Sequence, residues 1–99
     1  MTQITIDFQE GFLHDKAAVY VNGETAATIA DVTTKNQIGL AERVQLEAPP
    51  GEADLKVELP NRNISLQQKI PTGSNIFVGV SLTGDKLRFN IQSREFWYA

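Results

Sequence analysis

A single histidine is the main candidate for acid–base or metal chemistry in this chain. His14 is followed by Asp15, and Asp7 and Glu10 precede it, so a carboxylate could orient the imidazole as a general base or a ligand. The surrounding glycine and lysine instead favour a solvent-exposed turn, and a lone imidazole offers no second ligand at a usable spacing. We therefore expect neither a catalytic nor a metal-binding role for His14.

Other catalytic sets are missing from the sequence. The chain has no cysteine, which excludes a disulfide framework, a thiol nucleophile and a thiolate metal site. The serines lack a Gly-x-Ser-x-Gly context, and all of them would have to share His14. The turn at residues 71–75 lacks the lysine and the following helix of a phosphate-binding loop. We predict that the protein is not an enzyme and uses no cofactor or metal.

Three consecutive aromatic residues, Phe96, Trp97 and Tyr98, lie near the end of the chain. The strand alternation before them would carry Ser93 and Glu95 inward, so we expect the register to break and a separate tail to begin there. Either this tail packs on its own domain, or it is exposed and docks to a partner. We favour packing, because an exposed tryptophan and tyrosine reduce solubility.

The same aromatic residues are the candidates for ligand or partner binding. Tryptophan and tyrosine are enriched at binding hot spots, and their flat faces also stack on sugars. We therefore select Phe96, Trp97 and Tyr98, with Tyr20 as a further aromatic face.

Charge argues against nucleic acid and against a membrane surface. Twelve acidic residues outnumber nine basic ones, and the formal net charge is −3. Lys86, Arg88 and Arg94 could form a basic face near the aromatic tail, but acidic residues such as Glu58 are interleaved with the cations. This mixture is typical of a solvated sheet face.

Length and composition predict one domain over residues 1–99. A hydrophobic fraction of 41% is enough for a single core and too high for a disordered chain. The N-terminal residues alternate polar and apolar, with neither the basic region nor the apolar stretch of a signal peptide, and no apolar run could span a membrane. We expect a cytoplasmic location.

Apolar residues recur with period two, which is typical of half-buried strands. Three turns would place these apolar sets opposite one another, at residues 49–52, 60–63 and 84–85. The first turn would also place Arg43 opposite Glu58. The expected apolar partners are Ala48 with Ala53, Leu46 with Leu55, Val44 with Val57, Leu59 with Ile64, Val57 with Leu66, Ala53 with Ile70, Leu82 with Leu87, Val80 with Phe89, and Val78 with Ile91.

A further hairpin is expected at Asn22-Gly23, the strongest short turn signal in the chain. It would place Val21 opposite Glu24 and Val19 opposite Ala26. Each face of this hairpin would then mix apolar and polar residues, which is typical of a hairpin at a sheet edge or of one covered on both faces. Residues 30–43 lack a clear period and are expected to form a loop, with one helical turn suggested by the capping-box spacing of residues 34–37. We interpret this loop as a crossover between sheets.

Seven to eight short strands with regular turns predict an all-β, antiparallel β-sandwich, either immunoglobulin-like or prealbumin-like, with a small barrel as the alternative.

Two turn motifs resemble those of PEGA-type and related prealbumin-like domains. One is the strand Val19-Tyr20-Val21 leading into Asn22-Gly23, and the other is the Pro-Gly turn before the alternating strand at residues 49–57. Together they cover about fifteen residues of the chain, and the strands after Pro60 have no counterpart in that unit. The resemblance implies a non-enzymatic accessory or binding module and transfers no site residues.

We therefore expect a small non-enzymatic binding, adaptor or structural module that acts through protein contacts, self-association included. The alternative is a carbohydrate-binding accessory module that uses the terminal aromatics.

Overall fold

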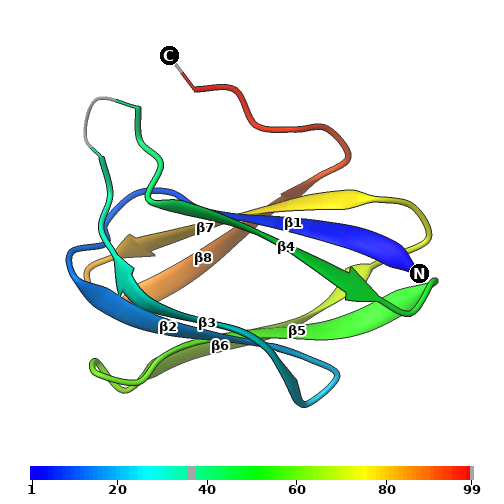
Figure 1. Cartoon of the computed structure of the whole chain (residues 1–99), viewed down its shortest axis with the longest axis horizontal. Coiled ribbons are helices and arrows are strands. Elements are labelled where there is room, and N and C mark those ends of the chain that lie inside the picture. Colours follow the sequence, from blue (N-terminus) through cyan, green and yellow to red (C-terminus); the bar gives the residue numbers. More distant parts are fainter. Residues whose placement is uncertain (36–37, 99) are drawn as a thin grey trace.

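The computed structural model describes residues 1–35 and 38–98, which form two four-stranded sheets (Figure 1). Sheet A has the strand order β4-β1-β7-β8, and sheet B has the order β3-β2-β5-β6. The strands are β1 (Thr2–Phe8), β2 (Asp15–Val21), β3 (Glu24–Val32), β4 (Glu42–Ala48), β5 (Glu52–Leu59), β6 (Ile64–Pro71), β7 (Ile76–Thr83) and β8 (Lys86–Gln92). The described residues contain no helix that could span a membrane.

The predicted all-β sandwich is confirmed, and the two sheets face each other across one apolar core (Figure 1). They do not close into the barrel that was the alternative. The alternating residues of β1, β5 and β7 supply most of the inward side chains, and Phe8 meets Phe12 edge to face with 5.5 Å between ring centroids. One strand pair departs from the antiparallel prediction, because β1 and β7 run parallel. A parallel pair needs a long connection, which strands of the other sheet provide here.

Two of the expected hairpins are confirmed residue by residue. In β5–β6, Leu59 lies opposite Ile64 and Ala53 opposite Ile70. In β7–β8, all three expected apolar pairs form around the Gly84-Asp85 turn. In both hairpins, the length of the turn and the alternation of apolar residues require the same register.

The expected pairing of β4 with β5 is wrong. β4 pairs with β1, so that Leu46 lies opposite Ile4, whereas β5 pairs with β2 and β6 in the other sheet. The turn at residues 49–51 therefore carries the chain from one sheet to the other. Both strands point their apolar residues into the same core from opposite sides, and so alternation alone could not choose the partner. As a result Arg43 lies opposite Asp7 and not opposite Glu58.

The β2–β3 hairpin turns at Asn22 and Gly23, whose φ angles of 51° and 83° match the expected tight turn. Its register is as expected next to the turn, but Val19 lies opposite Ala27 where Ala26 was expected, because a bulge interrupts the ladder. β3 then continues to Val32, and the chain crosses from sheet B to sheet A, which confirms the crossover. The capping-box prediction depends on residues 36 and 37, which lie outside the described residues.

Candidate functional site

A buried carboxylate lies on the outer face of sheet A. Asp7 alternates with the inward-facing Ile6 and Phe8, so its side chain points away from the core, yet it is only 1% exposed. Arg43 on the neighbouring strand β4 covers it and donates two hydrogen bonds, from Nε to Oδ1 at 2.7 Å and from Nη2 to Oδ2 at 2.9 Å. This bidentate geometry fixes the orientation of both side chains.

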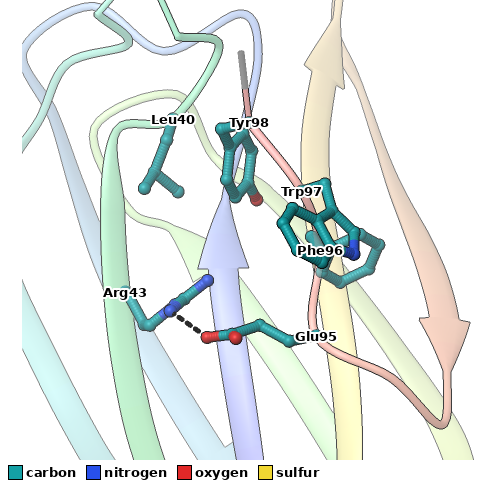
Figure 2. A pocket seen from close by; sticks show the side chains of 6 residues that line it. All are labelled: Leu40, Arg43, Glu95, Phe96, Trp97 and Tyr98. Carbon is teal, nitrogen blue, oxygen red and sulfur yellow. Dashed lines mark hydrogen bonds and ion pairs between the residues drawn. The ribbon is translucent and has the colours of Figure 1, made fainter.

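Residues 93–98, which we call the C-terminal tail, pass beside Arg43 (Figure 2) and contact both members of this ion pair. Arg43 uses its remaining Nη1 to donate to Glu95 Oε2 at 2.6 Å, and the Tyr98 hydroxyl donates to Asp7 Oδ2 at 2.7 Å. Gln9 Nε2 in turn donates to the Tyr98 hydroxyl at 3.0 Å. The tail is thereby attached on both sides of Trp97, at Glu95 and at Tyr98.

A glycine in the middle of β7 makes room for Gln9. A Cβ atom added at Gly79 would lie 2.6 Å from Gln9 Oε1 and 2.8 Å from its Cδ, so the glutamine side chain lies directly on the bare backbone. Gln9 is further held by its backbone N–H, which donates to the carbonyl of Val80 at 2.7 Å. Gly79 thus leaves room for the glutamine whose side-chain amide donates to the Tyr98 hydroxyl.

The attached tail presents Trp97 to solvent. Its side chain is 96% exposed, whereas Phe96 and Tyr98 are half-buried. The aromatic residues border a shallow hollow of about 340 Å³, which Leu40, on the side away from Trp97, and the Arg43–Glu95 pair also line (Figure 2). The expectation that the tail packs on its own domain is therefore confirmed for Tyr98 and wrong for Trp97.

Tyr20 is not part of this surface, because it lies on the outer face of sheet B. Lys56 Nζ is 5.4 Å from the centre of its ring, and the Tyr20 hydroxyl donates to Glu58 at 3.3 Å. The negative charge of Glu58 raises the pKa of Tyr20 above its ordinary value. The structure brings together three of the four candidate aromatics and leaves Tyr20 apart from them.

No protein-family model, curated protein or solved structure matches the chain. The resemblance to PEGA-type domains, which rests on two turns, stays a prediction.

His14 lies in an exposed turn, as expected, and a carboxylate does face it. This carboxylate is Asp31 of β3, whose Oδ2 lies 3.2 Å from His14 Nδ1. A hydrogen bond from Thr33 and then the contact with His14 lower the pKa of Asp31. Within the described residues, no group of three or more His, Asp and Glu side chains could hold a metal ion.

Asp15, which follows His14 in the sequence, has a different partner. Asp15 is 3% exposed and forms an ion pair with Arg62 from the β5–β6 turn. Arg62 donates from Nε to Asp15 Oδ1 and from Nη2 to Asp15 Oδ2, the second at 3.2 Å. Its Oδ2 also accepts the backbone N–H of Leu13 at 2.9 Å. Asp15 therefore links the β5–β6 turn to the start of β2.

The sequence interpretation missed the residues that hold the tail, namely Asp7, Gln9 and Arg43. One signal was available, because aspartate is disfavoured within strands and Asp7 stands between the apolar residues Ile6 and Phe8 near the end of β1. Its partner could not be found in the same way, since Arg43 was assigned to a different strand pair.

The Tyr98 phenol provides a test of the tail contact. Burial and the hydrogen bond to Asp7 raise its pKa from 10.0 to about 12. A raised folded-state pKa means that the stabilisation is complete below about pH 10 and is lost as the pH rises towards about 12. We expect the tyrosinate absorbance of a Tyr20→Phe variant, in which Tyr98 is the remaining tyrosine, to rise about two pH units above that of the unfolded chain. Titration near pH 10 in the folded protein would contradict the contact.

Proposed function

We propose that this protein is a non-enzymatic protein-binding module, with Trp97 of the C-terminal tail at the centre of its contact surface. One observation carries the proposal. Trp97 is 96% exposed while the residues around it, Glu95 and Tyr98, are attached to a buried ion pair.

Attachment of the tail matters for affinity, because a free chain end would lose conformational entropy on binding. The contacts of Glu95 and Tyr98 remove much of that freedom before a partner arrives. An exposed tryptophan held in this way resembles the rigid aromatic anchors that dominate protein interfaces.

The hollow beside Trp97 supports a peptide or protein surface as the ligand. Leu40 and Phe96 supply apolar walls, and the guanidinium of Arg43 beside them is already paired with both Glu95 and Asp7. A partner can therefore insert an apolar side chain without leaving a buried charge unpaired.

A carbohydrate is the second candidate ligand, and the exposed ring of Trp97 favours it. Sugar stacking requires an open aromatic face, and only Trp97 among the candidate aromatics is almost fully exposed. Tyr20, which was expected to assist, lies on the other sheet.

Selection from a random peptide library on the immobilised protein tests the proposal. Selected peptides should bind the wild-type chain and shift the emission of Trp97, the only tryptophan. The Trp97→Ala variant should bind them at least about tenfold more weakly, as expected for a hot spot. Leu13→Ala removes another exposed apolar side chain, 64% exposed, outside the tail and should leave binding unchanged. Failure to select any Trp97-dependent peptide would contradict the proposal, and Trp97-dependent signals on a glycan array would establish the carbohydrate alternative instead.

A further inference from the structure

The outermost strands of sheet B carry charges of opposite sign. β3 contains Glu24 and Asp31 and no cation, whereas Lys69 is the one charged residue of β6. All three side chains are exposed. Asp31 faces His14, and Lys69 Nζ lies 3.4 Å from Glu52 in an exposed pair of the kind that contributes little stability.

The outermost strands of sheet A repeat the arrangement. β8 contains the exposed cations Lys86 and Arg88 and no acid, whereas β4 contains the exposed acids Glu42 and Glu47. The arginine of β4 does not cancel these acids, because Arg43 is already bound to Asp7 and Glu95. None of these four exposed residues forms an ion pair with another of the residues that the structure describes.

The matching edges lie on the same sides of the sandwich. Across the core, β3 contacts β4 and β6 contacts β8. One side of the molecule therefore carries exposed acids on both of its outermost strands, and the opposite side carries exposed cations on both. We call these the acidic side and the basic side. Each outermost strand also has one row of backbone N–H and C=O groups without a neighbouring strand in its own sheet.

Charge on an edge strand normally prevents edge-to-edge association. Here it prevents only the pairing of like edges, such as β8 with β8, in which cations would oppose cations. Pairing of the basic side with the acidic side of another molecule brings opposite charges together. The geometry thus permits a head-to-tail contact and disfavours a two-fold one.

Strand directions are compatible with such a contact. β4 is antiparallel to β1, β1 is parallel to β7, and β7 is antiparallel to β8, so β4 and β8 run parallel. Three successive antiparallel pairs make β3 and β6 antiparallel. A second copy in the same orientation would therefore extend sheet A by a parallel pair and sheet B by an antiparallel pair, both of which are regular sheet geometries.

We propose that the acidic side, β3 and β4, binds the basic side, β6 and β8, of a second copy of this chain, so that the molecules associate head to tail. This contact uses the strand edges and not the aromatic tail, and it goes beyond the proposed function of Trp97.

A charge-swap experiment tests the proposal by sedimentation velocity over a range of concentrations. The wild-type chain should associate at low salt, and the association should weaken as added salt screens the charges. Lys69→Glu with Arg88→Glu makes both sides acidic, and the triple variant Glu24→Lys, Glu42→Lys and Glu47→Lys makes both sides basic. Each of these two variants alone should associate at least about tenfold more weakly than the wild type.

An equimolar mixture of the acidic double variant and the basic triple variant should associate again, because acidic molecules then alternate with basic ones. Circular dichroism verifies that each variant is folded, as expected for exposed substitutions. A wild-type chain that stays monomeric at every salt concentration, or association that neither reversal weakens, would overturn the proposal. Trp97→Ala should associate like the wild type, which separates this result from the test of the proposed function.

Discussion

Replacement of Gly11 by alanine should lower the free energy of unfolding by about 3 kcal/mol or more. The φ angle of Gly11 is +93°, a region that L-residues with a side chain rarely adopt, and an added Cβ would lie 1.8 Å from the carbonyl oxygen of Leu82. That oxygen belongs to the backbone of β7 and cannot rotate away. Relief of the clash must separate the β1–β2 loop from β7, and it would weaken the hydrogen bond from Leu82 N–H to the Glu10 carbonyl, 2.9 Å long.

Gly23→Ala is the matched control for this prediction. Gly23 has a similar φ of +83°, but nothing lies within 4 Å of the added Cβ, so the expected cost is the conformational one of about 1 kcal/mol. Urea unfolding of both variants, followed by circular dichroism, gives the difference in stability. Equal losses in the two variants would contradict the close approach of Gly11 to β7.

The second large effect is expected at the ion pair under the tail. Arg43→Met removes both hydrogen bonds from the guanidinium to Asp7 and leaves a carboxylate, 1% exposed, with the Tyr98 hydroxyl as its remaining side-chain donor. Loss of one partner of a buried ion pair typically costs about 3 kcal/mol or more, because the other charge stays buried and unpaired. We expect a decrease of about that size in the free energy of unfolding.

Two further variants separate this cause from the loss of an arginine as such. Arg88→Met removes an exposed arginine from the same sheet and should change stability by no more than about 0.5 kcal/mol. Asp7→Leu combined with Arg43→Met replaces both charges by apolar groups and should recover much of the loss, because no buried charge remains. If Arg43→Met is as mild as Arg88→Met, the carboxylate of Asp7 is not buried as described.

The sequence was sufficient to predict the sandwich because its strands alternate cleanly and its short turns allow few registers. The β5–β6 and β7–β8 hairpins follow directly from turn length and parity. For the β2–β3 hairpin, the predicted register is correct next to Asn22-Gly23 and differs by one residue beyond Tyr20. The difference comes from a bulge, which the apolar pattern of the sequence does not reveal.

The partner of β4 could not be predicted for a different reason. In a two-layer fold, two consecutive strands both point their apolar residues into the core. This holds whether the strands pair within one sheet or lie in opposite sheets, so their apolar pattern is the same in both cases. The turn at residues 49–52 permits either outcome, and the pairing of Leu46 with Ile4 depends on the assembly of the whole molecule.

The wrong pairing of β4 also explains why the sequence predicted the aromatic residues of the tail site but not the polar residues that hold them. The aromatic cluster was visible as a local feature of composition, but the residues that fix it come from β1, β4 and the segment after β1. With Arg43 assigned to Glu58, nothing in the sequence connected Asp7 to the tail. Long-range polar contacts of this kind depend on tertiary structure and have no periodic signal.

The time-resolved fluorescence anisotropy of Trp97, measured together with its quenching by iodide, tests most directly whether the tail presents a fixed tryptophan. An exposed indole on an attached tail should be quenched readily and should rotate with the whole domain. In the Arg43→Met variant the same indole should stay accessible but gain fast local motion. Fast local motion already in the wild-type protein, or an indole shielded from iodide, would contradict the fixed and exposed Trp97 on which the proposed function depends.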